Sequence, residues 1–324
     1  MNGNNAYEEK IQKQINQILT NYPDLKGFYY FITDLSLATV YDYLNYITNF
    51  MDFVEDDFPC LKVEHFTFYL NQYKKKSSSY QIAIYSALKK FSTYLYVSEK
   101  INKDIMLYIK RPKFKESQTT KMKREKGFLE EHEIKEYLST VKTGAGTKTA
   151  IARQKQWYDR DMAIILLFLN TGIRCSALYK LDVNSIDFDK KMLTTVEKGE
   201  DVVSISLSDE LLSQLVVWLD KRQKILGDKK EDALFISNQK RRMDQSSISR
   251  IVRKYAQIEG KHITPHKLRA TYGTQLYSHT KDLYFVQKNM RHSDPKITQI
   301  YIRGQNDNMQ KKAATIMSEL TIKY

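Results

Sequence analysis

A basic stretch at residues 111–126 constrains the fold of this chain most, because it has almost no apolar periodicity. It carries seven basic and two acidic side chains, together with Pro112 and a short Ser/Gln/Thr run. A segment of this composition buries little apolar surface and is typical of an extended linker. The 324 residues therefore divide into two predicted domains, residues 1–110 and 127–324, each long enough to enclose its own core.

Residues 1–110 are predicted to form a small all-α domain of four or five short helices. Apolar side chains recur there at spacings of three and four, which is the period of a helix with one buried face. The clearest segments are residues 7–19, 35–54 and 79–96. Ser77 and Ser78 precede the last of these, where a serine can cap unpaired N–H groups, and such groups also bind phosphate.

Residues 127–324 are predicted to be mixed α/β, with helices in the majority. Two β-like runs, residues 192–196 and 202–207, flank a charged turn and indicate a hairpin. Helical periodicity marks residues 128–141, 159–169, 208–224, 246–257 and 268–277. The predicted fold is thus mainly α with a small β-sheet.

The charge of the chain is strongly positive, with 52 basic and 38 acidic residues and a formal net charge of +14. Residues 1–110 balance at 12 basic and 12 acidic side chains, whereas residues 127–324 carry 33 and 24. This excess favours nucleic acid or another anionic partner, with solubility alone as the alternative.

Several classes of protein are excluded by what the sequence lacks. The longest apolar run, residues 162–169, has eight residues, whereas a membrane span needs roughly 20. The first residues have neither the basic nor the apolar region of a secretion signal. Cys60 and Cys175 form no CxxC motif, which argues against a disulfide framework or a zinc finger. We expect a cytoplasmic protein with no membrane association, metal or other cofactor.

Three short segments together carry a resemblance to a known family. They are TGIRCSAL at residues 171–178, TPHKLRAT at 264–271 and MRHSDPKITQIY at 290–301. In this order and spacing, with nine residues from His292 to Tyr301, they resemble the motifs of the tyrosine recombinases of the phage integrase family. The resemblance covers residues 127–310 well, and residues 30–110 only as a helical domain of suitable size.

The resemblance implies a metal-independent and ATP-independent cleavage of DNA. Tyr301 would be the nucleophile, and a phenol with a pKa near 10 needs a nearby base or a strongly positive site. His266 would accept its proton, or hold the phosphate and share that task. Arg174 and Arg269 are planar, permanently charged groups suited to phosphate oxygens. Lys198, in the predicted hairpin turn, would protonate the leaving 5′ oxygen, although a neighbouring lysine could do so, and His292 would bind the phosphate. The implied catalytic set is Arg174, Lys198, His266, Arg269, His292 and Tyr301.

Further basic side chains are candidates for DNA contact. In the linker they are Lys121, Lys123 and Arg124, and beyond it Arg242 and Arg250. In the predicted helix 246–257, apolar spacing places Ile248, Ile251, Val252 and Tyr255 toward the core and Arg250, Arg253 and Lys254 away from it. Such a basic face suits a DNA groove, but it is also common on any exposed helix.

The resemblance also implies partners: a double-stranded DNA recombination site, a homotetramer on two such sites that passes through a Holliday junction, and a possible accessory or directionality protein. An Xer-like or mobile-element enzyme fits the length of the N-terminal region. A regulatory DNA-binding protein with the same fold and a monomeric relaxing topoisomerase are the alternatives.

Two positions depart from the family pattern, since many members have Glu or Asp at Ala177 and Gly at Arg291. The first removes an expected partner near Arg174, and the second adds positive charge and bulk beside His292.

Overall fold

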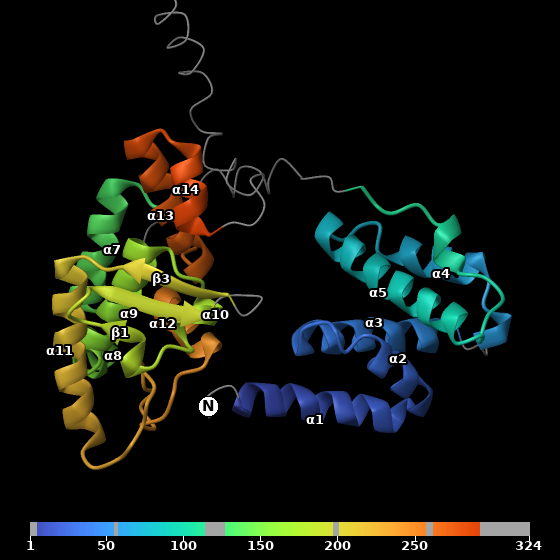
Figure 1. Ribbon diagram of the computed structural model, residues 1–324, viewed down its shortest axis with the longest axis horizontal. Helices are drawn as coiled ribbons and strands as arrows, with labels where there is room; N and C mark the ends of the chain where they lie inside the picture. Colours follow the sequence, from blue (N-terminus) through green and yellow to red (C-terminus); the bar gives the residue numbers. More distant parts are fainter. Residues whose placement is uncertain (1–4, 55–57, 114–126, 197–200, 257–261, 292–324) are drawn as a thin grey trace, which may run out of the picture. The chain divides into compact units, whose positions relative to one another are not determined.

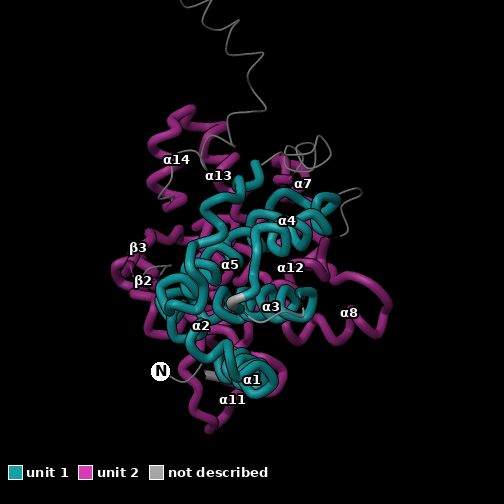
Figure 2. Tube along the Cα trace, turned by 90° about the vertical axis from the view of Figure 1, so that its right-hand side faces the viewer, with its two compact units in different colours: residues 1–118 teal, residues 119–324 magenta. Residues whose placement is uncertain are grey.

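The computed structural model describes residues 5–54, 58–113, 127–196, 201–256 and 262–291. The chain forms two compact units, Met1–Gln118 and Thr119–Tyr324, which Figure 2 distinguishes by colour. The division falls within the stretch predicted as a linker. Residues 114–126 of that stretch, with Lys121, Lys123 and Arg124, lie outside the described residues.

The first unit is all-α in its described residues, as predicted. Its helices are α1 (Asn5–Asn21), α2 (Lys26–Phe31), α3 (Leu37–Val54), α4 (Val63–Gln72) and α5 (Ser78–Val97), with single turns of 3₁₀-helix between α1 and α2, between α3 and α4, and after α5. Helices α2, α3 and α4 all contact α5, and α1 contacts α3. Buried aromatic rings fill the space between them, with Phe50 and Phe66 4.6 Å apart at their centroids. The Ser77 hydroxyl accepts a hydrogen bond from the Tyr80 amide, which confirms the predicted cap of α5.

The second unit is built around α9 (Tyr158–Thr171), which lies among the other helices of that unit in Figure 1. Its residues 162–169 are all apolar and mostly buried. A helix of this kind is stable when other elements cover most of its surface. Among the described helices, those that contact it most extensively are α7 (Glu131–Thr143), α11 (Asp209–Leu226), α12 (Gln245–Lys254) and α13 (Pro265–Thr280). The described part also includes α8 (Lys148–Lys155), α10 (Cys175–Leu178) and α14 (Leu283–Met290).

A small antiparallel sheet completes the unit, with strand order β1-β2-β3. The predicted hairpin is confirmed: β2 (Met192–Val196) pairs with β3 (Val202–Ser206) from Met192 opposite Ser206 to Val196 opposite Val202. The turn with Lys198 lies outside the described residues. Strand β1 (Ile186–Asp187) was not predicted, because two residues are too few to show alternation.

Helix α12 presents its apolar side to the core as predicted, with Ile248, Ile251 and Val252 buried. Lys254 departs from the prediction of an outward position, since its ammonium lies 2.6 Å from the carboxylate of Asp161. Asp161 is fully buried in α9 and also pairs with Arg160 at 2.8 Å. A buried carboxylate needs such compensation, so it draws in a lysine that would otherwise face water.

Among the described helices, none has the length and apolar character that a membrane crossing would require. The described residues likewise contain no cluster of histidine, cysteine or acidic side chains that could hold a metal ion.

Candidate active site

The first turns of α13 carry two of the predicted site residues. Thr264 caps the helix by accepting a hydrogen bond from the Lys267 amide, and Pro265 occupies the first turn, where its missing N–H has no cost. His266 and Arg269 follow at a spacing of three, which places them on one helix face, as predicted. His266 is exposed, whereas Arg269 is only 5% exposed.

Arg269 draws together two loops that are distant in sequence. Its guanidinium donates to the backbone carbonyl of Gly172, just after α9, and to that of Met290, at the end of α14. Gly172 has a left-handed backbone with φ of +57°, and a Cβ there would lie 2.3 Å from the Tyr272 ring. Glycine is therefore required at this point, because it tolerates the conformation and leaves room for the ring.

Arg174 lies two residues beyond Gly172, at the N-terminal end of α10. Its guanidinium donates to the carbonyl of Arg291 at 2.9 Å. Burial, and then the positive charge of Arg291, lower its pKa from the usual value. An arginine starts from a pKa above 12, so Arg174 remains charged at neutral pH.

Arg291 ends α14 in a left-handed conformation, with φ of +53°. This backbone suits glycine, the residue that the family pattern led us to expect here, because a helix often ends on a left-handed residue. The Arg291 side chain turns back into the protein and donates to the carbonyls of Asn289 at 2.9 Å and Thr171 at 3.1 Å. The expected bulk beside His292 is thus directed at the end of α9, and His292 itself lies outside the described residues.

The site therefore gathers positive charge, with Arg174, Arg269 and Arg291 linked through the two loops. Protein packed around the imidazole of His266, and then the charge of Arg269, lower the pKa of this histidine. Both causes favour the neutral ring, which can accept a proton. A cluster of guanidinium groups beside a neutral imidazole is suited to bind a phosphate group and to accept a proton from an attacking hydroxyl.

Lys198, His292 and Tyr301 lie outside the described residues, so their predicted roles stay predictions. Arg250 is exposed on the outer side of α12 and contacts the Ser247 hydroxyl at 2.8 Å.

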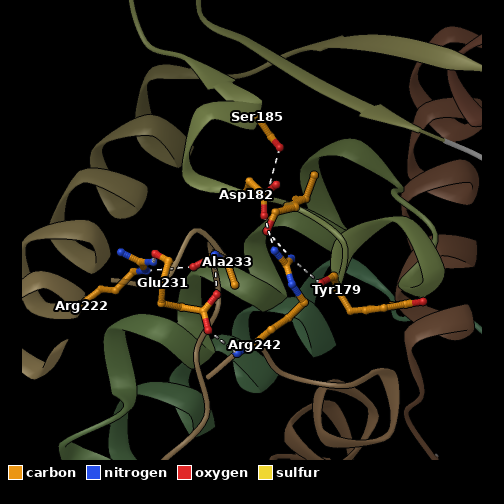
Figure 3. A network of polar contacts seen from close by, with 8 residues as sticks. Tyr179, Asp182, Ser185, Arg222, Glu231, Ala233 and Arg242 are labelled. Atoms are coloured by element: carbon orange, nitrogen blue, oxygen red, sulfur yellow. Dashed lines mark hydrogen bonds and ion pairs between the residues drawn. The ribbon is translucent and has the colours of Figure 1, made fainter. Parts of the chain in front are cut away.

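Arg242 occupies an internal position (Figure 3). Its guanidinium donates to the carbonyls of Tyr179 at 3.2 Å and Leu181 at 3.0 Å, and it pairs with the Asp182 carboxylate. The Arg242 amide donates to Glu231, whose carboxylate also receives the amide of Ala233. These contacts hold the loop before α12 to the segment after α10. Because the guanidinium is engaged inside the protein, we leave Arg242 out of the DNA-contacting set.

The family follows from a comparison of the sequence with family models. Residues 127–308, more than half of the chain, match the model of the phage integrase family. The chain belongs to the phage integrase family. The resemblance read from the three motifs is thereby confirmed, and the protein is a tyrosine recombinase, an enzyme of site-specific DNA recombination.

Similar proteins in this family share most of the length of the chain. Tyrosine recombinases XerS of Streptococcus thermophilus (strain CNRZ 1066) and of Streptococcus pyogenes serotype M3 are each 28% identical, over 86% of this chain and 90% of the relative. Both matches therefore include parts of both units of this recombinase.

Solved structures show the same fold. XerH site-specific recombinase bound to palindromic difH substrate, in a post-cleavage complex, has a TM-score of 0.63 at 17% identity, covering 85% of this chain and 77% of that chain. A lambda integrase (75-356) dimer bound to a COC′ core site has a TM-score of 0.61 at 18% identity, covering 88% and 94%. The mainly α architecture with a small sheet is thus the architecture of this integrase family.

Proposed function

We propose that this recombinase cleaves and rejoins DNA through a covalent 3′-phosphotyrosyl intermediate on Tyr301, without metal or ATP. The observation that carries the proposal is the arrangement of Arg174 and Arg269, whose guanidinium groups both bond to the end of α14, with His266 on the same helix face as Arg269. These are the predicted phosphate-binding residues, and they come from separate parts of the sequence.

The reaction begins when the Tyr301 phenol attacks the scissile phosphorus and gives its proton to His266, whose lowered pKa keeps the ring in the neutral form that can accept a proton. Arg174 and Arg269 stabilise the negative charge that grows on the non-bridging oxygens, and removal of one such donor typically costs about 10²–10³-fold in rate. His292 adds a hydrogen bond to the same phosphate.

The bond from phosphorus to the 5′ oxygen then breaks, and Lys198 supplies the proton for that oxygen. The 5′ hydroxyl of a partner strand attacks the phosphotyrosyl bond, so that one phosphodiester replaces another and no external energy is needed. Exchange of the first pair of strands gives a Holliday junction, and exchange of the second pair resolves it.

The proposed partner is a double-stranded DNA recombination site, and four copies of the chain assemble on two sites. Lys121, Lys123 and Arg124 in the linker and Arg250 on α12 contact the phosphate backbone, each adding to the salt dependence of binding. The reaction takes place in the cytoplasm, with an accessory or directionality protein as a further partner. Structures of XerH and lambda integrase bound to DNA sites support the DNA partner.

Covalent capture from a random pool tests the proposal and identifies the target site in the same experiment. The protein is incubated in EDTA with nicked duplexes of random sequence, and DNA that stays attached under denaturing conditions is recovered and sequenced. We expect adducts that converge on one site and that Y301F does not form. Binding to a defined site without any adduct would favour a regulatory protein, and adducts accompanied by relaxation of supercoils without recombinants would favour a topoisomerase.

A further inference from the structure

Arg291 occupies a position at which its backbone would suit glycine better. Its φ of +53° and ψ of +47° lie in the left-handed region, which a residue with a side chain enters at a cost and glycine enters without one. Backbone strain of this kind persists where the surroundings fix it, and it clusters at functional sites. The contacts of the Arg291 side chain indicate what the strained position provides.

The guanidinium of Arg291 bridges the ends of two helices. It donates to the carbonyl of Asn289 at 2.9 Å, in the last turn of α14, and to the carbonyl of Thr171 at 3.1 Å, the last residue of α9. Arg291 is partly buried, so these bonds are made with limited competition from water. The planar fork of arginine is suited to holding two carbonyls at once.

The phosphate-binding residues also join the end of α9 to the end of α14, through hydrogen bonds of their own. Arg174 donates to the carbonyl of Arg291 at 2.9 Å, while Arg269 donates to the carbonyls of Met290 and Gly172. The position of the Arg174 guanidinium therefore depends on where the end of α14 lies. That end is held to α9 by the Arg291 side chain.

We propose that Arg291 is a positioning residue of the phosphate site, which fixes the end of α14 against the end of α9 so that Arg174 and Arg269 bind one phosphate in a defined orientation. The inference rests on the proposed function and names a residue that the family pattern does not supply. Arg291 acts through Arg174 and Arg269 in this scheme and makes no phosphate contact of its own.

The substitution R291G tests the proposal, because glycine relieves the backbone strain while it removes the two side-chain bonds. Lys281 offers a matched control: it ends α13 in the same left-handed conformation, with φ of +54°, so K281G also relieves strain and removes one positive charge. Relief of strain offsets the lost contacts in R291G, and we expect its melting temperature to stay within about 4 °C of the wild type.

Two readouts separate positioning from other roles. In the DNA-free protein, amide hydrogen exchange of residues 171–175 should be about five- to tenfold faster in R291G, and unchanged in K281G. In single-turnover cleavage at saturating DNA, R291G should be about ten- to a hundredfold slower, because small misplacements of catalytic groups have effects of this size. Its DNA dissociation constant should change less than about threefold, with an unchanged salt dependence.

The proposal would be overturned if R291G exchanged the amide hydrogens of residues 171–175 at the wild-type rate, or if it cleaved DNA at the wild-type rate. The proposal would also be overturned if the slope of log binding constant against log salt concentration were smaller by about 0.9 in R291G, since that result indicates a direct phosphate contact. Failure of the proposed function is a separate outcome, visible as a wild-type protein that forms no adduct. The exchange measurement decides the role of Arg291 in that case too, because it needs no DNA.

Discussion

Asp161 is predicted to be indispensable for the stability of the catalytic unit. Its carboxylate is fully buried and receives Arg160 at 2.8 Å, Lys254 at 2.6 Å and the Tyr255 hydroxyl at 2.8 Å. The variant D161N keeps the shape of the side chain but removes its charge, which leaves two buried or partly buried cations without compensation. Removal of one partner of a buried pair typically costs about 3–5 kcal/mol. For a domain of this size, the same loss corresponds to roughly 6–20 °C in melting temperature.

The chain offers a convenient assay and a matched control. Both of its tryptophans, Trp157 and Trp218, lie in the second unit, so denaturant unfolding followed by tryptophan fluorescence reports on that unit alone. The control is D220N. Asp220 pairs with Lys224 at 2.7 Å, nearly the same distance, but these side chains are 66% and 74% exposed.

An exposed pair contributes about 0–1 kcal/mol, so D220N should unfold almost as the wild type does. The reasoning would be refuted if the free energies of unfolding of D161N and D220N lay within about 1 kcal/mol of each other. Burial would then not be what makes the Asp161 contacts strong.

The loop after α9 leaves no room for a side chain at Gly172. G172A places a methyl group against the Tyr272 ring, and we expect fluorescence-detected unfolding to show a loss of about 2–4 kcal/mol, with slower DNA cleavage. His266 should give a characteristic pH dependence: its pKa is lowered in the folded protein, so the unfolded chain binds the proton more readily, and stability declines as the pH falls below about 6.5. Cleavage rates should hold from about pH 8 to below about 6.5 and fall only when the pH passes the lowered pKa of His266 in the folded protein, and a rate that rises on acidification would contradict the role of a neutral base. R242A should cost about 2–3 kcal/mol of stability without changing the salt dependence of DNA binding, whereas R250A should lower the salt slope by about 0.9 and keep stability. Equal salt slopes for the two variants would show that the roles of these arginines were misassigned.

Local patterns predicted much of the fold because they depend on neighbours in sequence. The helix at residues 159–169 was predicted from continuous apolar character and spans Tyr158–Thr171. The hairpin at residues 192–207 was predicted from two β-like runs and their turn. Helix α8 was missed because it has no buried residues, so it shows no apolar periodicity.

Long-range partners could not be predicted in the same way. Lys254 was expected to face water because nothing in its own helix indicates that Asp161, 93 residues away, needs a cation. The internal partners of Arg242, a predicted DNA contact, could not be foreseen for the same reason, because they lie about sixty residues earlier in the sequence. The pairing of His266 with Arg269 was predictable because a spacing of three already places two residues on one helix face.

The carbonyls that receive Arg174 and Arg269 have a consequence for competing anions. Bonds from these guanidinium groups to Gly172, Met290 and Arg291 are already formed in the DNA-free protein, so part of the hydrogen-bonding capacity of both groups is committed to the backbone before a phosphate arrives. A single dissolved phosphate ion therefore gains less from the site than it would from two fully solvated arginines. A phosphate within a duplex arrives at high effective concentration, because contacts elsewhere along the DNA already hold it in place. The recombinase can thus keep these charged arginines in a solution rich in small anions and still reserve them for DNA.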